Sequence, residues 1–346
     1  MPNDLIFNWL QEAYERRASD LHLSAGNLPA LRINGELCKV GDVPITKESA
    51  EAMALRLMTS DQADKLRSEG EVDFSLALPG CCRFRLNVYK QRGLISIAAR
   101  IIPSQIPTFE QLQLPASLAL LAERHQGLIL VTGPTGSGKS STLAALIDHI
   151  NRKQARHIVT LEDPIEFLHT SKNSIIDQRE VGQDTRSFSN GLRAALRQDP
   201  DVILVGEMRD LETIAAAITA AETGHLVLAT LHTSDAPQTI DRVIDAFPAH
   251  QQGQIRSQLA SILVTIVAQR LLPKRADGRA CATEILMNTP AVANLIRTDK
   301  VHQIRSVMQT SRTLGMHTMD MSVKDLLLAG TIHPDAAKPY LAEGGL

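Results

Sequence analysis

The sequence predicts an α/β protein with two domains, a smaller α+β domain followed by a larger one built on a mostly parallel sheet. Three observations support this. The chain has 346 residues, a length typical of about two domains. Its first hundred residues mix helical segments with short alternating strands. From about residue 110, apolar strands alternate with helices, which is the pattern of a parallel sheet wrapped by helices.

The N-terminal domain, residues 1–102, is expected to contain helices over 4–17 and 47–69 and strands over 21–23, 30–33, 83–89 and 95–102. Asn34 and Gly35 favour a hairpin turn after the second strand. The segment Arg83–Tyr89 alternates with period two and places basic side chains on one face.

Two prolines, Pro103 and Pro107, indicate a linker, which we place over 103–115. The second domain then covers 116–346. Its strands are expected over 127–132, 156–161, 202–206 and 225–231. The C-terminal part is expected to be mainly helical, with helices over 253–272, 289–297, 301–310 and 319–329.

A glycine-rich loop joins the apolar strand 127–132 to a helical segment over 142–148, which is the context a phosphate-binding loop requires. Its glycines let backbone N–H groups turn towards a polyanion, and the helix N-terminus adds positive potential. Lys139 can reach the β- and γ-phosphates, and Ser140 can offer its hydroxyl to Mg²⁺. The sequence therefore predicts that this loop binds a nucleoside triphosphate, ATP. The predicted binding residues are Gly133, Pro134, Thr135, Gly136, Ser137, Gly138, Lys139, Ser140 and Ser141.

Three carboxylates follow the strand over 156–161, namely Glu162, Asp163 and Glu166. Catalytic groups in such sheets lie at the carboxyl ends of strands, beside the phosphate loop. Carboxylates there can hold Mg²⁺ through water or orient the attacking water. We expect Glu162 and Asp163 at the metal and Glu166 near the lytic water, with an ordinary polar turn as the alternative.

Two later strands end in polar residues. Glu207 follows the strand over 202–206, where a carboxylate can polarise water or hold the metal. His225 and His232 flank the next strand, and their odd spacing places them on opposite faces, so no shared metal site is expected. His232 lies at the carboxyl end, where a sensor of the γ-phosphate belongs, whereas His225 is expected to be structural.

The composition narrows the function classes. A net charge of −2 and an aromatic content of 3% argue against a nucleic-acid partner. The longest apolar run is far shorter than the ~20 residues of a membrane span, and the N-terminus lacks a secretion signal. We therefore expect a cytoplasmic protein. The four cysteines contain no C-x-x-C pair, which argues against a structural zinc site.

The combination of motifs resembles the secretion ATPase superfamily, whose ring-shaped hexamers drive type II secretion and type IV pili. Within it, the chain resembles the ATPases that retract type IV pili. The likeness is carried by the phosphate loop and by Glu162–Glu166, Gly206–Asp210, Gly224–Thr233, Ser19–Gly26, Arg83–Asn87, Pro290–Arg297 and Gly315–Asp320.

Two segments depart from the family pattern. Val292 and Ala293 stand where the family usually carries Ile-Arg, so a charge is missing. The turn Lys90–Gly93 is one residue shorter than in many relatives. Neither belongs to the predicted ATP site, but both leave open which subtype of the family the chain represents.

The resemblance implies a PAS-like N-terminal domain and a RecA-like ATPase domain that assemble as a homohexamer. Glu207, and after it Glu166, would position the lytic water, and His232 would report whether the γ-phosphate is present. Arginines stabilise the charge on a transferring phosphoryl group. The candidates are Arg83, Arg85 and Arg100, supplied in cis or in trans, and the alternative is that they form a solvated strand face.

The resemblance also implies a location and a partner: the cytoplasmic face of the inner membrane, peripheral to it, where ATP hydrolysis would pull on a pilus platform protein. Extension and secretion ATPases usually add a long N-terminal region and a four-cysteine zinc insertion. Neither is found in this sequence, so retraction and twitching motility are favoured. An accessory retraction ATPase, a pilus-assembly or type II secretion ATPase, a RecA-like nucleic-acid translocase and a non-catalytic scaffold stay open.

Overall fold

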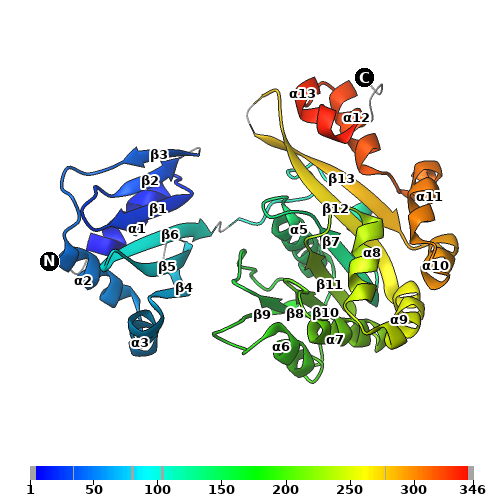
Figure 1. Ribbon diagram of the computed structural model, residues 1–346, viewed down its shortest axis with the longest axis horizontal. Helices are drawn as coiled ribbons and strands as arrows, with labels where there is room; N and C mark the ends of the chain where they lie inside the picture. Colours follow the sequence, from blue (N-terminus) through cyan, green and yellow to red (C-terminus); the bar gives the residue numbers. More distant parts are fainter. Residues whose placement is uncertain (1–4, 34, 79–81, 103–104, 277, 342–346) are drawn as a thin grey trace. The chain divides into compact units, whose positions relative to one another are not determined.

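The chain forms two compact units, Met1–Gln105 and Ile106–Leu346 (Figure 1). The computed structural model describes residues 5–33, 35–78, 82–102, 105–276 and 278–341. The linker predicted over 103–115 spans the division between the units. Within that range, Phe109 and Leu114 are buried in the core of the second unit.

Among the described residues, the first unit contains a six-stranded antiparallel sheet in the order β3-β2-β1-β6-β5-β4. Its strands are β1 (Asp20–Ser24), β2 (Ala30–Ile33), β3 (Glu36–Lys39), β4 (Glu71–Ala77), β5 (Arg83–Gln91) and β6 (Leu94–Ile102). Its helices are α1 (Leu5–Glu15), α2 (Lys47–Leu57) and α3 (Ser60–Glu69). The hairpin predicted at Asn34 and Gly35 joins β2 and β3, with Gly35 at φ +89° and Asn34 outside the described residues.

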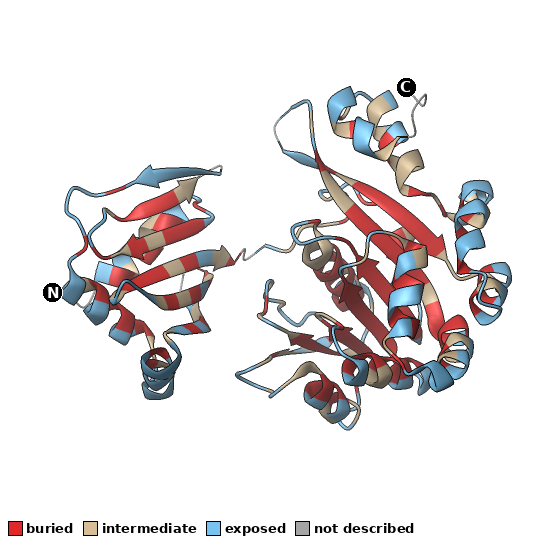
Figure 2. Cartoon of the chain, in the orientation of Figure 1, coloured by how far each residue is buried: buried red, intermediate tan, exposed pale blue. Residues whose placement is uncertain are grey.

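The helices of this unit bury one face of its sheet. Buried and more exposed residues alternate along β5 (Figure 2). Phe84, Leu86 and Val88 of this strand are buried in the same core as Leu10 of α1 and Met53 of α2. The sequence predicted one helical segment over 47–69, but the structure has two helices. The first ends at Leu57 with Met58 as its C-cap, and Thr59 caps the second, because Thr59 and Gln62 exchange side-chain and backbone hydrogen bonds.

The other face of this sheet carries a row of charges. The register places Asp20 of β1 opposite Arg32 of β2 and Arg100 of β6, and Arg100 opposite Arg85 of β5. Cross-strand neighbours on one face interact directly. Arg100 Nε lies 2.8 Å from Asp20 Oδ1. Burial raises the pKa of the Asp20 carboxyl, but hydrogen bonds from Ser19 and Arg100 outweigh it and hold that pKa below its usual range.

The second unit is built, among its described residues, on a seven-stranded sheet in the order β13-β12-β7-β11-β10-β8-β9. Its strands are β7 (Gly127–Thr132), β8 (His157–Glu162), β9 (Ile175–Glu180), β10 (Val202–Val205), β11 (Leu226–Leu231), β12 (Leu263–Pro273) and β13 (Arg279–Met287). β13 pairs antiparallel with β12, whereas the other strand pairs are parallel.

Helices cover both faces of this sheet. They are α4 (Ser117–Leu121), α5 (Lys139–Lys153), α6 (Phe188–Ala195), α7 (Leu211–Glu222), α8 (Ala236–Asp245), α9 (Ala249–Ile262), α10 (Pro290–Arg297), α11 (Ile304–Thr310), α12 (Met319–Leu328) and α13 (Pro334–Ala337). In β7, Leu128 and Leu130 join the core beneath α7–α9, and Ile129 and Val131 join the core beneath α4 and α5. A parallel sheet buried on both faces is the architecture predicted from the sequence, and the α/β class is confirmed.

The C-terminal part corrects one prediction. The helix expected over 253–272 ends at Ile262, and the chain continues directly into β12. The run from Val264 to Val267 consists of β-branched residues, which favour a strand. β9 and β13 were not predicted either.

One buried carboxylate ties two helices to the edge of this sheet. Glu284 of β13 accepts a hydrogen bond from Ala236 N, at the start of α8, and another from Met319 N, at the start of α12, at 2.8 and 3.2 Å. Burial raises the pKa of its carboxyl, and the two amide donors oppose that shift. The first turns of both helices therefore share one acceptor.

Candidate active site

Four parallel strands place their carboxyl ends at one edge of the second sheet. Thr132 of β7 lies beside Leu231 of β11, and Val205 of β10 lies between Ala229 of β11 and Leu161 of β8. The residues that leave these strands therefore meet at the edge where ligands bind in such sheets. They are the phosphate loop, His232, Gly206-Glu207 and Glu162 with the residues that follow it.

The phosphate loop has the backbone of an anion cradle. Gly133 has φ +139°, and a Cβ there would lie 2.5 Å from Gln269 O, so only glycine fits. Gly138, at φ +91°, precedes α5, whose first-turn amides receive no side-chain cap. Ser137 Oγ is buried and has no hydrogen-bond partner among the described residues. Free donors at a helix N-terminus fit the phosphates of a nucleotide.

Lys139 begins α5 and folds back on the loop. Its Nζ donates to Gly133 O at 2.8 Å and to Pro134 O at 3.1 Å. Burial and the neighbouring Arg270 lower its pKa, and the charges of Glu207 and Glu166 oppose that shift. Two carboxylates and a second cation thus act on the lysine that the sequence singled out.

Arg270 was missed by the sequence reasoning because its segment was predicted as a helix. It belongs to β12, beside the phosphate-loop strand β7. Its Nη1 atom is buried and has no hydrogen-bond partner among the described residues. A buried guanidinium nitrogen without an acceptor is costly, and a bound anion would satisfy it.

Glu207 and His232 lie together at the ends of β10 and β11. His232 Nε2 is 3.1 Å from Glu207 Oε1, and Arg209 Nη2 is 2.7 Å from Glu207 Oε2. Partial burial raises the pKa of the Glu207 carboxyl. The opposing effect of Arg209, followed by His232 and Lys139, is larger, so the pKa lies below its usual value. The carboxylate therefore stays ionised and can accept a proton at neutral pH.

Gly206 sets the backbone that presents Glu207. Its N–H donates to Leu161 O at 2.8 Å, and its carbonyl accepts the hydroxyl of Thr230. A Cβ at Gly206 would lie 3.0 Å from Leu161 O. Two neighbouring strands thus fix the position of Glu207.

The acidic segment after β8 divides its carboxylates between two environments. Asp163 and Glu166 are exposed. Glu162 instead directs its oxygens into the protein, accepting from Thr160 Oγ1 at 2.6 Å, Gln178 Nε2 at 3.1 Å and Glu166 N at 3.4 Å. Burial raises the pKa of the Glu162 carboxyl, which these hydrogen bonds oppose. Because hydrogen bonds within the protein occupy both of its oxygens, Glu162 is a poor metal ligand.

A magnesium ion at such a site is held mainly by phosphate oxygens, water and a hydroxyl or carboxylate. Ser140, in the first turn of α5, carries a hydroxyl of this kind. Across the part of the chain that the structure describes, His, Cys, Asp and Glu side chains form no cluster of three or more able to hold a metal ion by themselves. The exposed carboxylate of Asp163 makes no side-chain hydrogen bond among the described residues, so Ser140 and Asp163 stay the predicted metal-site residues.

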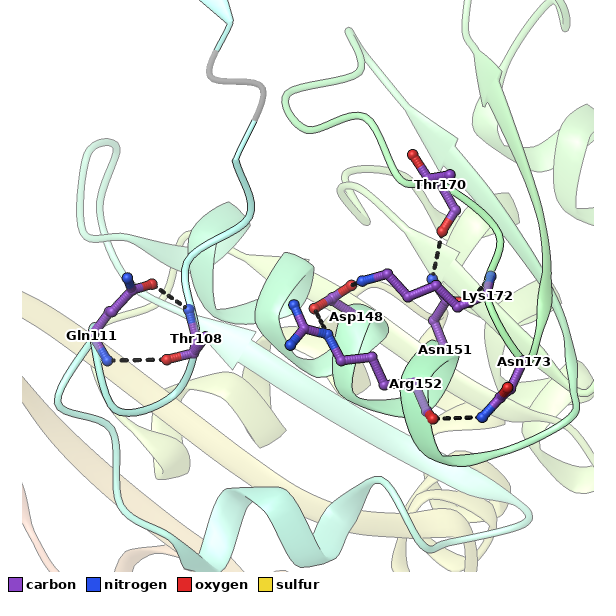
Figure 3. A network of polar contacts seen from close by, with 8 residues as sticks. All are labelled: Thr108, Gln111, Asp148, Asn151, Arg152, Thr170, Lys172 and Asn173. Atoms are coloured by element: carbon purple, nitrogen blue, oxygen red, sulfur yellow. Dashed lines mark hydrogen bonds and ion pairs between the residues drawn. The ribbon is translucent and has the colours of Figure 1, made fainter.

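The segment between β8 and β9 is also fastened to α5 (Figure 3). Asn151 of α5 donates to Thr170 O at 2.8 Å and accepts from Lys172 N at 2.9 Å. Asp148 forms ion pairs with Lys172 and Arg152 at 2.5 and 2.7 Å. The helix that starts at the phosphate loop therefore holds the far end of the acidic segment.

The remaining predicted residues lie elsewhere. Arg83, Arg85 and Arg100 belong to the first unit, on β5 and β6. Of these, Arg100 pairs with Asp20. His225 lies at the other end of β11, where its Nδ1 is 2.9 Å from Ala220 O of α7, in keeping with the structural role expected for it. In the described part of the chain, every helix is too short or too polar to cross a membrane.

A phosphate loop beside an acidic residue and a histidine, at the carboxyl edge of a parallel sheet, defines a P-loop ATPase. Comparison with known proteins gives the family. The model of the family described as Type II/IV secretion system protein matches residues 3–329, and the chain belongs to that family. The resemblance to the secretion ATPases found in the sequence is confirmed.

Individual relatives agree over almost the whole chain. It is 48% identical over 321 residues to the type IV pilus retractation ATPase PilT of Pseudomonas aeruginosa, covering 93% of both chains. It is 48% identical over 311 residues to the twitching motility protein of Neisseria gonorrhoeae, covering 90% of this chain and 83% of that one. A crystal structure of the pilus retraction motor PilT with bound ADP superposes with a TM-score of 0.91 at 47% identity, covering 99% and 97% of the two chains.

Proposed function

We propose that this protein is an ATPase motor that powers the retraction of type IV pili. The observation that carries ATP hydrolysis is the pairing of Glu207 with His232 at 3.1 Å, on the sheet edge that also holds the phosphate loop. Its relatives support the assignment, because one is described as a pilus retraction ATPase and another as a twitching motility protein.

In the proposed reaction, the amides of the phosphate loop and Lys139 bind the phosphates of ATP. Lys139 would exchange the carbonyls of Gly133 and Pro134 for phosphate oxygens. Arg270 would supply a second positive charge. Ser140 would hold Mg²⁺, with Asp163 as the predicted carboxylate, and the ion would neutralise charge on the phosphates.

Glu207 would accept the proton of the attacking water, because it lies at the sheet edge beside the phosphate loop and its carboxylate is ionised at neutral pH. His232, within hydrogen-bonding distance of Glu207, would contact the γ-phosphate and report its loss to the start of α8. Glu166 would help to orient the water from the segment after β8. Hydrolysis would change the contacts of these groups and so drive a conformational step.

We further propose that the motor is a homohexamer and that Arg83, Arg85 or Arg100 stabilises the transferring phosphoryl group, in cis or in trans. If the arginines act between subunits, specific ATPase activity rises with protein concentration as rings form. Constant specific activity from dilute monomer to assembled ring would exclude a shared site. Analytical ultracentrifugation at the same concentrations identifies the assembled species.

The biochemical test is Lys139→Ala. This variant should release phosphate at least about a hundredfold more slowly, because the loop loses the cation that contacts the β- and γ-phosphates. A matched control is Lys65→Ala, which removes an exposed lysine from α3 of the first unit. Near-normal phosphate release by Lys139→Ala would overturn the site assignment.

The cellular test concerns the direction of force. The proposed partner is a pilus platform protein at the cytoplasmic face of the inner membrane. Cells that lack the motor should keep or accumulate surface pili but lose twitching motility, and a Lys139→Ala copy should not restore it. Cells without pili would instead indicate an assembly motor. Unchanged filaments and movement would indicate a secretion role or an accessory one.

A further inference from the structure

The segment that carries Glu166 is held by hydrogen bonds to the backbone of four of the five residues from 165 to 169. Ile165 N donates to Glu180 Oε2 at 3.2 Å, and Glu166 N donates to Glu162 Oε2 at 3.4 Å. Phe167 O accepts from Gln178 at 2.8 Å, and His169 N donates to the same side chain at 2.8 Å. The acceptors and donors come from the ends of β8 and β9.

Gln178 of β9 is the centre of this arrangement. Its Nε2 donates to Phe167 O at 2.8 Å and to Glu162 Oε1 at 3.1 Å, and its Oε1 accepts from His169 N at 2.8 Å. Both amide protons and the amide oxygen are thus used. Other polar side chains of similar size would not meet these demands, because a carboxylate lacks the donors and an amine lacks the acceptor.

Glu162 connects Gln178 to Glu166. One of its oxygens accepts from Gln178 and from Thr160, and the other accepts from Glu166 N. A carboxylate with both oxygens engaged in the protein orients its neighbours. It has little free capacity for a magnesium ion, which requires oxygen ligands in near-octahedral geometry.

The geometry points to Gln178 as the positioning residue for Glu166, acting through Glu162 and through Phe167 O. This inference rests on the proposed function, in which Glu166 helps to orient the lytic water. It assigns Glu162 to the support of the loop in place of the metal. Among the described residues, the side-chain hydrogen bonds of Gln178 go to Glu162, Phe167 and His169 and not to the phosphate loop.

The physical reason for a large effect is that both backbone hydrogen bonds of Gln178 lie directly after Glu166, at Phe167 and His169. Losing them frees the backbone at Phe167 and His169, while the attachment of Thr170 and Lys172 to α5 is retained. The loop should stay docked at its far end but lose its register near Glu166. A misplacement of about 1 Å of a reacting group can cost up to about a hundredfold in rate.

The test compares Gln178→Met with Gln154→Met in the full-length, assembled protein. Methionine keeps the length of the side chain and removes its polar atoms. Gln154 provides a matched control, since it is also partly buried and donates to Ala122 O at 2.8 Å, but does not contact the Glu166 segment. We expect Gln178→Met to lower kcat about tenfold or more, with KM for MgATP within about twofold of wild type. Gln154→Met should keep kcat within about twofold.

A double-mutant cycle with Glu166→Gln separates positioning from general loss of structure. If Gln178 acts through Glu166, the double variant Glu166→Gln/Gln178→Met should be no slower than Glu166→Gln alone, within about twofold. Multiplicative losses in the cycle would overturn the inference. So would a Gln178→Met variant with the kcat of the Gln154→Met control, or one that raises KM while kcat is unchanged.

The same experiment distinguishes failure of the inference from failure of the proposed function. If Glu166→Gln turns over like wild type, Glu166 has no role in catalysis, and the positioning role of Gln178 is wrong with it. If Glu166→Gln is impaired and Gln178→Met is not, the role of Glu166 stands and the inference alone is overturned. Thermal unfolding of each variant shows whether it is folded at the assay temperature.

Discussion

The two sheets of this molecule expose their charged groups in different ways. All six residues of β7 in the second unit are buried, and helices cover both faces of its sheet. In β5 of the first unit, buried residues alternate with more exposed ones, and Arg85 is exposed on the face away from the helices. The parallel sheet can therefore offer chemistry only at its carboxyl edge, whereas the antiparallel sheet can offer it on a face.

This difference explains why the sequence pointed to single residues after the strands of the second unit but only to a group of arginines in the first unit. Few sequence positions can lie at the carboxyl edge of a parallel sheet, since each strand contributes only the one or two residues that follow it. A face is long, because every second residue of each strand belongs to it. Arg32, Arg85 and Arg100 lie in one row around Asp20, and their spacing alone does not separate a catalytic arginine from a solvated one.

The largest effect is expected at the edge. Glu207→Gln should lower kcat at least about a hundredfold and leave ATP binding intact, because the amide is nearly isosteric but cannot accept the proton. Phosphate release and nucleotide binding, measured on the same preparation, check both parts. If Glu166→Gln loses turnover and Glu207→Gln does not, the ranking of the two carboxylates is reversed.

A smaller effect is expected on the face. Arg85→Ala should lower kcat about tenfold or more in the assembled protein if this arginine stabilises the transition state. Arg67→Ala serves as the control, because Arg67 is an exposed arginine of the same unit that pairs with Asp64 on α3. Equal kcat values for the two variants would show that the face at Arg85 is only solvated.

A backbone change sharpens the contrast further. In Gly206→Ala the new Cβ would lie 3.0 Å from Leu161 O, so the chain at Glu207 must shift by a few tenths of an ångström. We expect kcat to fall about three- to tenfold. Gly253→Ala, where no atom lies within 4 Å of the new Cβ, should instead stabilise α9 by about 0.5–1 kcal/mol. Steady-state kinetics and thermal unfolding of both variants test this; an unchanged kcat for Gly206→Ala would contradict it.

The smallest effect is a shift along the pH axis. Arg209 lowers the pKa of the Glu207 carboxyl, so Glu207 remains ionised at more acidic pH than an ordinary glutamate. Removing that charge in Arg209→Gln raises the pKa, and the acid limb of the kcat–pH profile should move to higher pH. Arg312→Gln, which removes another exposed, ion-paired arginine, should leave the limb in place. A profile unchanged by Arg209→Gln would argue against Glu207 as the base.

Much of the second sheet could be predicted because its strands are apolar and short. β7 was predicted with its bounds, and β8, β10 and β11 within about one residue of theirs. β12 was not, because it follows α9 without a turn and no glycine or proline marks the boundary at Ile262. β9, with the polar sequence Asp177-Gln178-Arg179-Glu180, lies at an edge of the sheet and lacks the apolar run of the inner strands.

Candidate site residues could be predicted where they directly follow a strand. They could not be predicted where only contacts distant in sequence bring them to the site. Glu207 and His232 follow their strands directly. Arg270 reaches the phosphate loop only because β12 pairs with β7. Gln178 is recognised only from the side-chain hydrogen bonds that connect it to Glu162 and the backbone near Glu166. Such long-range pairings arise from the tertiary fold, and local sequence patterns do not report them.

Glu284 connects two helices that are distant in the sequence, α8 and α12. Its carboxylate is the common fixing point for the first turn of α8, which continues from His232, and for the first turn of α12 near the C-terminus. Pulling either helix away would leave a buried carboxyl oxygen without a donor, at a cost of about 1–3 kcal/mol. Glu284 therefore couples the position of α12 directly to the segment that follows His232.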